Sequence, residues 1–487
     1  MIINNNLLVR NLRGNWSLKL LFEFAYRNKA YSKKNGFLDI SRKEYFPPFK
    51  RAPIIMNSFI REKVMSNLFF HNPTSKIVKD KILSDARKHK IIHLKCFDYK
   101  TLFKLLLIKN SADLANFSIN GIPYGKFIHT TLIANYGVKH FRIALRDCTQ
   151  NIIIFHRFLV GFRTINNLIE DFSYSQIILI NGRDAVGTGA QLAAYIHNIN
   201  IICLENNLNT TDYPKYSEWM GNMHHWKIRE TAVKDSLLKS KAKFSLEDAK
   251  NFLSTRFGLH SKFWANAELD ESILANLSSK SFVTFFTTSE KETTTCPTGI
   301  KDFNEFDQYD QTESLLNVYE AARKLDLDLI IRLHPNFSNN RIAKNELNYF
   351  LNLTKNWKNT KVISNSNSTN SYKLASLAFL NFTFRSSLSA ELSLLGIDCY
   401  QTANNGWSFT CPEKVKIEKN EIYEAMQKNE TLSATELDLY ALACYQCTFS
   451  VEFSSMQIIS KNSSTYSNFI DGNELDIPKY EFYKTRN

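Results

Sequence analysis

The sequence lacks an uninterrupted apolar run of the roughly 18 to 20 residues that a bilayer-spanning helix needs. Runs such as Ile177-Ile178-Leu179-Ile180 have the length of buried strands. We therefore expect no membrane-spanning segment. Residues 1–13 show no apolar core followed by a small-residue cleavage site, so we also expect no secretory signal and a cytoplasmic location.

Glycine and proline are scarce, at 15 and 10 of 487 residues, whereas Asn, Lys, Ile and Phe are abundant. We interpret this skew as nucleotide-composition bias. Hydrophobic residues make up 44% of the chain and charged residues 22%, close to globular averages, which excludes wholesale disorder. The length is too great for one core and predicts two large domains.

Cysteine is thinly scattered, and its mostly apolar surroundings are typical of reduced, buried thiols. Cys444 and Cys447 alone have metal or redox spacing. No second Cys or His pair lies nearby in the sequence, and both fall in a helix-like run over 434–450, which favours a buried helical pair over a site. The others are Cys96, Cys148, Cys203, Cys296, Cys399 and Cys411.

Negative charge is in deficit, which leaves a net charge of +14 and a pI near 9.2. Such a surface attracts nucleic acid, phospholipid headgroups or a phosphate-rich substrate. The Lys and Arg residues are spread along the chain, without zinc-finger spacing, an RNP-type aromatic motif or a basic helix. We therefore expect no nucleic-acid partner, and an anionic membrane surface or glycan remains open.

Four segments follow from shifts in pattern along the chain. Residues 1–75 form a basic and aromatic extension, in which Tyr45-Phe-Pro-Pro-Phe49 breaks any helix. Residues 76–275 and 276–410 are predicted as two Rossmann-like domains, and 411–487 as a tail with one good helix. The role of the extension stays open, although its composition suits docking on an anionic membrane that carries a lipid-linked acceptor.

The first predicted domain contains a β-turn-α-β unit. Its strands cover 175–180 and 199–204, its helix 189–196, and the turn is Asn181-Gly182-Arg183. A further strand is expected at 91–94, and 152–155 is either a strand or the start of a helix. Units of this kind form parallel sheets with ligands at the carboxyl ends of the strands.

The second predicted domain is a regular doubly wound α/β series. Expected helices cover 311–325, 372–376 and 389–395. Expected strands cover 281–287, 327–333, 361–363, 378–382 and 398–401.

Polar residues end two strands of this second domain. The apolar strand over 330–333 delivers Arg332 and His334 to its carboxyl edge, where Pro335 and Asn336 follow. A cation and an imidazole at that edge can contact a nucleotide phosphate, while the alternative is a strand end that happens to be polar.

The second constellation follows the strand that ends at Phe382. Arg385, Ser386 and Ser387 stand between that strand and a helix, where hydroxyls and unpaired N–H groups can donate to a phosphate. Glu391, one turn into the helix, can accept from a ribose hydroxyl. The alternative for this segment is an ordinary helix cap, with Glu391 in a capping box.

The order of these elements resembles the capsule-polysaccharide-synthesis glycosyltransferases of GT-B fold, which are related to β-Kdo transferases and bacterial sialyltransferases. Those enzymes carry an R-x-H-P strand end and an S-S-x-x-x-E turn and helix in their C-terminal domain. The turn 181–183, Glu205 at the end of the next strand, and the Ser289-Glu290 loop match further family features. The chain departs from the family in two places. Glu205-Asn-Asn stands where relatives have Glu-x-Gly, and Leu392 stands where relatives have Ala after the helix Glu.

The resemblance implies two Rossmann-like domains that face each other across a cleft and hold a nucleotide-sugar in the C-terminal half. The residues implied for that donor are Arg332, His334, Pro335, Asn336, Arg385, Ser386, Ser387, Glu391, Ser289 and Glu290. The implied transfer goes to a capsule or lipopolysaccharide glycan, with a CMP-linked ulosonic acid as the favoured donor. A CDP-polyol glycerophosphotransferase and a non-catalytic glycan-binding protein are the alternatives.

Catalytic groups are expected in the N-terminal half. Glu205 or Asp184, beside Arg183, can deprotonate an acceptor hydroxyl or attack the anomeric carbon, but an ion pair between Glu205 and Arg183 is an equal alternative. Asn181, His224 and His225 are candidates for acceptor binding. No Asp-x-Asp follows a strand, so we expect no metal or other cofactor, with Arg332, His334 and Arg385 stabilising the leaving phosphate.

Overall fold

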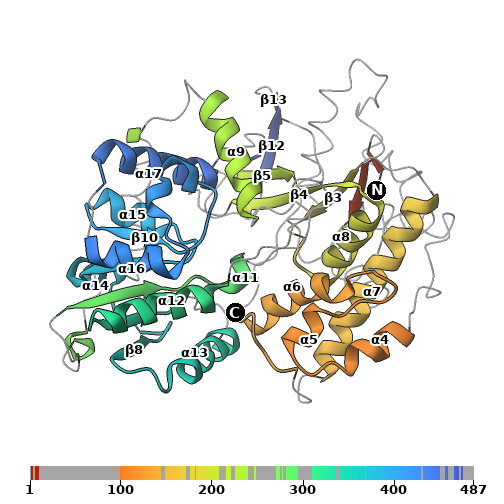
Figure 1. The fold of residues 1–487 in the computed structure, drawn as a ribbon. Coiled ribbons are helices and arrows are strands. Elements are labelled where there is room, and N and C mark those ends of the chain that lie inside the picture. Colours follow the sequence, from red (N-terminus) through yellow and green to blue (C-terminus); the bar gives the residue numbers. More distant parts are fainter. Residues whose placement is uncertain are drawn as a thin grey trace.

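The chain folds into two α/β units. Figure 1 shows the N-terminal unit mainly in orange and yellow and the C-terminal unit in green to blue. The computed structural model describes residues 2–3, 6–9, 99–143, 148–171, 176–180, 182–207, 215–220, 225–239, 246–247, 270–274, 277, 281–293, 310–335, 340–367, 369–428, 432–449, 456–458, 466–470 and 473–474.

The N-terminal unit is built on a five-stranded sheet in the order β1-β2-β3-β4-β5. Its three central strands are parallel, and the two outer strands pair antiparallel to them. The strands are β1 (Ile2–Ile3), β2 (Asn6–Val9), β3 (Gln176–Ile180), β4 (Asn200–Asn207) and β5 (Lys215–Met220). Residues 2–3 and 6–9 of the expected extension therefore contribute strands to this sheet.

The described part of this unit also contains helices, and the segment 152–155 lies within one of them. α8 begins after Asp184, whose carboxylate caps it, and ends at Asn198, which adopts the left-handed conformation. α7 packs closely on α8 because Gly161 and Gly189 leave room for backbone contact. A Cβ at Gly189 would lie 2.3 Å from the Phe158 carbonyl oxygen. The helices are α4 (Tyr99–Leu106), α5 (Ser111–Ala115), α6 (Tyr124–Tyr136), α7 (Cys148–Asp171) and α8 (Ala185–His197).

The C-terminal unit contains a fully parallel sheet in the order β10-β9-β6-β7-β8. This is the doubly wound order 3-2-1-4-5, in which the chain starts in the middle of the sheet and winds outward twice. The strands are β6 (Phe282–Phe286), β7 (Asp328–Arg332), β8 (Thr360–Ile363), β9 (Leu380–Thr383) and β10 (Cys399–Gln401). Each lies within two residues of its predicted bounds.

Helices cover both faces of this sheet, as two separate buried clusters on its strands indicate. The predicted helices at 311–325, 372–376 and 389–395 are present, and a further helix, α13, was not predicted. The helices are α11 (Glu290–Thr293), α12 (Gln311–Lys324), α13 (Asn340–Thr354), α14 (Ser371–Leu377) and α15 (Leu388–Leu394). Short 3-10 turns lie at Glu271–Ile273, Ser408–Thr410 and Pro412–Lys414.

The tail packs on the C-terminal unit: α16 (Lys419–Lys428) lies on α12, and α17 (Ala434–Phe449) lies on α15. α17 also contacts α9 (Trp226–Lys239), which precedes this unit in the chain. Cys444 is a buried thiol on α17, and Cys203, Cys399 and Cys411 are buried thiols elsewhere in the chain. A small antiparallel sheet contains β11 (Met456–Ile458), β12 (Tyr466–Ile470) and β13 (Asn473–Glu474).

The two units meet where α6 contacts α11 and α13. Gly137 ends α6 with φ +81°, and Ile342 of α13 lies against it. The Asn345 side-chain amide donates to the Tyr136 carbonyl at 3.2 Å, and Arg341 donates to the Gln150 side chain at 2.9 Å. These contacts fix one corner of the junction.

The predicted α/β class is confirmed by the strand order of the two sheets, and the pairing of two Rossmann-like units is GT-B-like, as expected. The strand predicted at 91–94 lies outside the described residues. None of the helices that the structure describes is long and apolar enough to cross a membrane.

Candidate functional site

The C-terminal sheet has a topological switch point between β6 and β9, because the chain leaves β6 for one side of the sheet and later returns to the other. Ligands of open α/β sheets bind in the crevice outside the carboxyl ends of the strands at such a point. The chain segments that leave β6, β9 and the neighbouring β7 therefore define the candidate site, and all three carry predicted site residues.

The segment after β6 is held by its neighbours on both sides. The Thr287 hydroxyl accepts from the backbone N–H of His334 at 2.8 Å, which ties the exit of β6 to the exit of β7. The side chain of Gln311, at the start of α12, accepts from the Thr288 N–H at 2.7 Å and donates to the Thr288 carbonyl at 3.2 Å. Ser289 is buried in this fixed loop, one residue before α11.

The Arg332 guanidinium is buried and points to the loop after β8. It donates to the carbonyl oxygens of Ser364, Asn367 (2.8 Å) and Thr369 (3.5 Å). Burial lowers the pKa of Arg332 to about 10. In the structure this arginine therefore braces the loop that leads into α14. Beside it, His334 and Pro335 are half-buried at the strand exit, and Asn336 lies outside the described residues.

The turn after β9 has an unusual backbone at Arg385, with φ +52°. A residue with a Cβ is strained in this left-handed region, and such residues cluster at ligand sites. The Arg385 side chain is 8% exposed, and burial, followed by the charge of Arg229, lowers its pKa to about 9. The turn thus holds a desolvated arginine at the switch point.

The two serines of this turn have different roles. The Ser386 hydroxyl accepts from the Leu388 N–H at 3.2 Å. The Ser387 hydroxyl makes no helix cap and donates instead to the Glu391 carboxylate at 2.9 Å. Glu391 also accepts from the Tyr372 hydroxyl at 2.6 Å. Glu391 therefore joins the β9 turn to α14, in place of a capping box.

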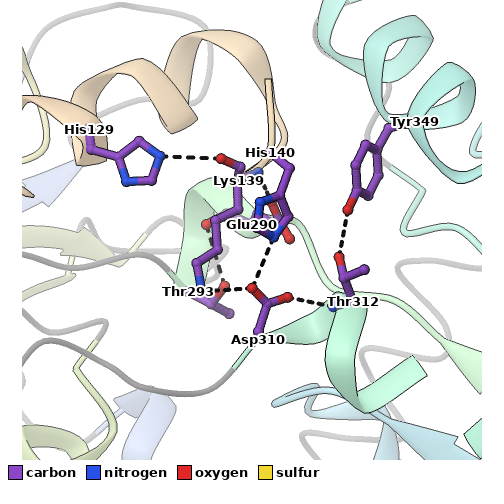
Figure 2. Close-up of polar contacts among 8 residues, drawn as sticks. All are labelled: His129, Lys139, His140, Glu290, Thr293, Asp310, Thr312 and Tyr349. Atoms are coloured by element: carbon purple, nitrogen blue, oxygen red, sulfur yellow. Dashed lines mark hydrogen bonds and ion pairs between the residues drawn. The ribbon is translucent and has the colours of Figure 1, made fainter. Parts of the chain in front are cut away.

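A cluster of charged side chains lies where the β6 exit meets the N-terminal unit (Figure 2). The Glu290 carboxylate accepts from the backbone N–H of Lys139. The Asp310 carboxylate lies 3.0 Å from both the Lys139 ammonium and the His140 ring nitrogen. Asp310 also caps α12 by accepting from the Thr312 N–H at 2.8 Å. The cluster therefore links residues after α6 to the starts of α11 and α12.

Burial and charge set the protonation of this cluster. Burial, and then the charge of Asp310, raise the pKa of Glu290 to about 7. The hydrogen bond to Asp310 raises the pKa of His140. The contacts with His140 and Lys139 outweigh burial and lower the pKa of Asp310. The protonation of Glu290 therefore changes near neutral pH.

Aromatic and imidazole groups surround the charged residues. The Tyr349 ring stacks on His140 with centroids 6.2 Å apart, and its hydroxyl lies 2.8 Å from the Thr312 hydroxyl. Burial raises the pKa of Tyr349 to about 12. The His129 ring contacts the Lys139 carbonyl at 3.2 Å, and burial lowers the pKa of His129 to about 4. Both groups are uncharged at neutral pH.

The predicted catalytic residues lie at the carboxyl edge of the N-terminal sheet. Glu205 follows the Ile180–Leu204 backbone pair and lies opposite Ser217 of β5. The Asp184 carboxylate accepts from the N–H groups of Val186 (3.0 Å) and Gly187 (3.2 Å). Asp184 is therefore the N-cap of α8, a local reason for its position.

The remaining predicted residues flank this edge. The Arg183 carbonyl accepts from the Thr131 hydroxyl at 3.2 Å. His225 is buried directly before α9, and its carbonyl accepts from the Arg229 N–H at 3.1 Å. Asn181 and His224 lie outside the described residues.

Sequence reasoning missed several residues that the fold brings to this region. Tyr372 hydrogen-bonds to Glu391, and Lys139, His140 and Asp310 form the charged junction. Asp310, directly before the helix predicted at 311–325, was a recognisable cap signal. Its charged partners, however, lie about 170 residues earlier in the chain. Within the part of the chain that the structure describes, no group of three or more His, Cys, Asp or Glu side chains is arranged to hold a metal ion.

No protein-family model and no curated protein matches the chain. Among solved structures, it is similar to a UDP-GlcNAc 2-epimerase of Methanocaldococcus jannaschii in complex with UDP-GlcNAc and UDP, at 15% identity and a TM-score of 0.26, over 58% of this chain and 79% of that one. It is also similar to two structures of KpsC from Thermosulfurimonas dismutans. The β-Kdo 2,4 transferase aligns at 13% identity and a TM-score of 0.34, over 55% and 79% of the two chains. The β-Kdo 2,7 transferase aligns at 13% identity and a TM-score of 0.30, over 67% of this chain and 92% of that one.

Proposed function

We propose that the protein is a glycosyltransferase that moves a sugar from a nucleotide-activated donor to a capsule or lipopolysaccharide glycan. The observation that carries this proposal is the Arg385–Ser387 turn, where a strained and buried arginine and two hydroxyls stand at the switch point of a doubly wound sheet. This combination suits a phosphate and the sugar hydroxyls of a nucleotide.

In this proposal the C-terminal unit binds the donor nucleotide. Arg385 and His334 contact its phosphate, and Ser386, Ser387 and Ser289 offer hydroxyls to the phosphate or ribose. Glu391 fixes Ser387 through their 2.9 Å hydrogen bond and is available to a ribose hydroxyl. Arg332 acts by positioning the 364–369 loop, because its guanidinium donates to three carbonyl oxygens there.

The N-terminal unit contributes the acceptor side. We favour Glu205 as the group that deprotonates the acceptor hydroxyl, since Asp184 has a structural task as the cap of α8. Arg183, Asn181, His224 and His225 are the candidates for acceptor contacts. The positive charge of Arg385 and hydrogen bonding by His334 would stabilise the leaving phosphate without a metal ion. The favoured donor is a CMP-linked ulosonic acid.

Thermal-shift measurements with CMP, CDP, UDP and GDP test the donor assignment. We expect a shift that is selective for cytidine nucleotides and is lost in His334→Ala. A matched control is His156→Ala, which removes a half-buried histidine from α7 in the other unit. A shift selective for UDP would contradict the cytidine donor, and no shift with any nucleotide would favour a non-catalytic glycan-binding protein.

A further inference from the structure

The left-handed backbone at Arg385 needs neighbours that hold it in place, because a residue with a Cβ keeps such a conformation only where the surrounding structure fixes it. The next carbonyl in the turn, that of Ser386, accepts two hydrogen bonds. The Gln401 side-chain amide donates to it at 2.8 Å, and the Ser389 hydroxyl donates to it at 3.1 Å. Both bonds fix the backbone directly after the strained residue.

The two donors belong to one buried network. Gln401, at the end of β10, also donates to the Ser389 hydroxyl, which in turn lies 2.7 Å from the Tyr440 hydroxyl. Gln401, Ser389 and Tyr440 are all fully shielded from solvent. A hydroxyl carries one proton, so Ser389, which donates to the Ser386 carbonyl, must accept from both Gln401 and Tyr440. The hydrogen bonds therefore run in one direction, from Tyr440 through Ser389 to Ser386.

Tyr440 comes from the tail, outside the doubly wound sheet. It lies on α17, which packs on α15, the helix that begins directly after the turn (Figure 1). The Tyr440 ring meets the Trp407 ring edge-on, with centroids 6.4 Å apart, in a buried cluster that includes Ala390. Burial raises the pKa of Tyr440, so its hydroxyl keeps its proton at neutral pH. Packing therefore fixes this hydroxyl as a hydrogen-bond donor.

We propose that Tyr440 is a positioning residue for the donor site and that, acting through Ser389, it holds the Arg385–Ser387 turn in the shape that binds the nucleotide. This inference rests on the proposed function and makes α17, a helix of the tail, part of the donor site. Hydrogen bonds in a poorly solvated network are stronger than in water and polarise one another, so each link constrains the next. Loss of the Tyr440 hydroxyl should loosen the turn without removing any group that touches the nucleotide.

Isothermal titration of the full-length protein with CMP tests the proposal. Tyr440→Phe removes the hydroxyl and keeps the ring, and we expect it to raise the Kd for CMP roughly 3- to 10-fold, the factor that a hydrogen bond of ordinary strength is worth. Ser389→Ala should weaken binding at least as much. Because Tyr440 acts through Ser389, Tyr440→Phe should then have no further effect in the Ser389→Ala background. A role in overall stability alone would leave the Kd of the folded protein unchanged.

Tyr423→Phe is the matched control, because it removes a hydroxyl that accepts from Gln427 at 3.0 Å on α16, which packs on α12. It should leave the Kd for CMP unchanged. If Tyr440→Phe binds CMP as tightly as the wild type while His334→Ala weakens binding, the positioning role is wrong and the proposed function stands. An effect of Tyr440→Phe that is equally large in the Ser389→Ala background would also overturn the positioning role. If the wild type binds no nucleotide, both proposals are wrong.

Discussion

Replacing Glu290 with glutamine is expected to make the stability of the protein less dependent on pH between about 4.5 and 7. The Glu290 carboxyl is buried at the junction of the two units, beside Asp310, and its pKa is raised from 4.5 to about 7, by burial first and then by Asp310. Glutamine keeps an oxygen that can accept from the Lys139 N–H and has no proton to lose.

The sign follows from the direction of the pKa shift. A carboxyl with a raised pKa in the folded state binds protons more tightly there than in the unfolded chain, so its contribution is present below pH 4.5 and is lost as pH rises through 7. A change from 4.5 to about 7 corresponds to roughly 3 kcal/mol between the two protonation states. Glu290→Gln should therefore be the more stable protein at pH 8, by up to about 3 kcal/mol, with little difference near pH 4.

Urea unfolding of the wild type and of Glu290→Gln at pH 4.5, 6 and 8 measures this difference. Glu292→Gln is the matched control, because Glu292 lies exposed on the same short helix. Its unfolding free energy should follow that of the wild type at every pH. Parallel curves for Glu290→Gln and the wild type would refute the assignment of a raised pKa to Glu290.

Two further changes test the contacts around the site. Asp310→Asn keeps a cap for α12 but removes the pairing with Lys139 and His140, so we expect a loss of about 1 kcal/mol in urea at pH 6. The loss should shrink as pH rises through the raised pKa of His140, because the ring then loses its proton and its charge; a loss that is equal over the whole pH range would contradict the pairing. Arg332→Ala leaves three loop carbonyls without their buried donor and should cost about 3 kcal/mol or more, with faster proteolysis at 364–369. Unchanged stability would contradict the bracing role.

The C-terminal unit was largely predictable because its signals are local. Short apolar runs gave each strand of the parallel sheet to within two residues, and helix α12 has a recognisable cap at Asp310. Helix α6 was not predicted, since most of its residues are buried and its sequence shows no single apolar face. The helix-or-strand ambiguity at 152–155 had a different cause, a short apolar run without context.

The candidate site was predictable in position but not in the task of each residue. The sequence indicates that Arg332 ends a strand, yet only the fold shows that its guanidinium turns to the loop after β8. The junction between Lys139 and Glu290 joins residues 151 positions apart, which no local pattern encodes. Glu391 was expected at a ribose or in a capping box, and its pairing with Tyr372 depends on how α14 and α15 pack.

Product analysis by mass spectrometry tests the central claim most directly. The full-length protein is incubated with a panel of nucleotide-sugars, CMP-linked ulosonic acids included, and a capsule- or lipopolysaccharide-type glycan acceptor. We predict an acceptor that gains one ulosonic acid residue, with turnover lost in Glu205→Gln and retained in Asp113→Asn, an exposed carboxylate on α5. Asp184→Asn should keep most of its turnover, because asparagine also caps a helix. Full turnover in Glu205→Gln would contradict the assigned base, and no transfer from any donor would contradict a glycosyltransferase.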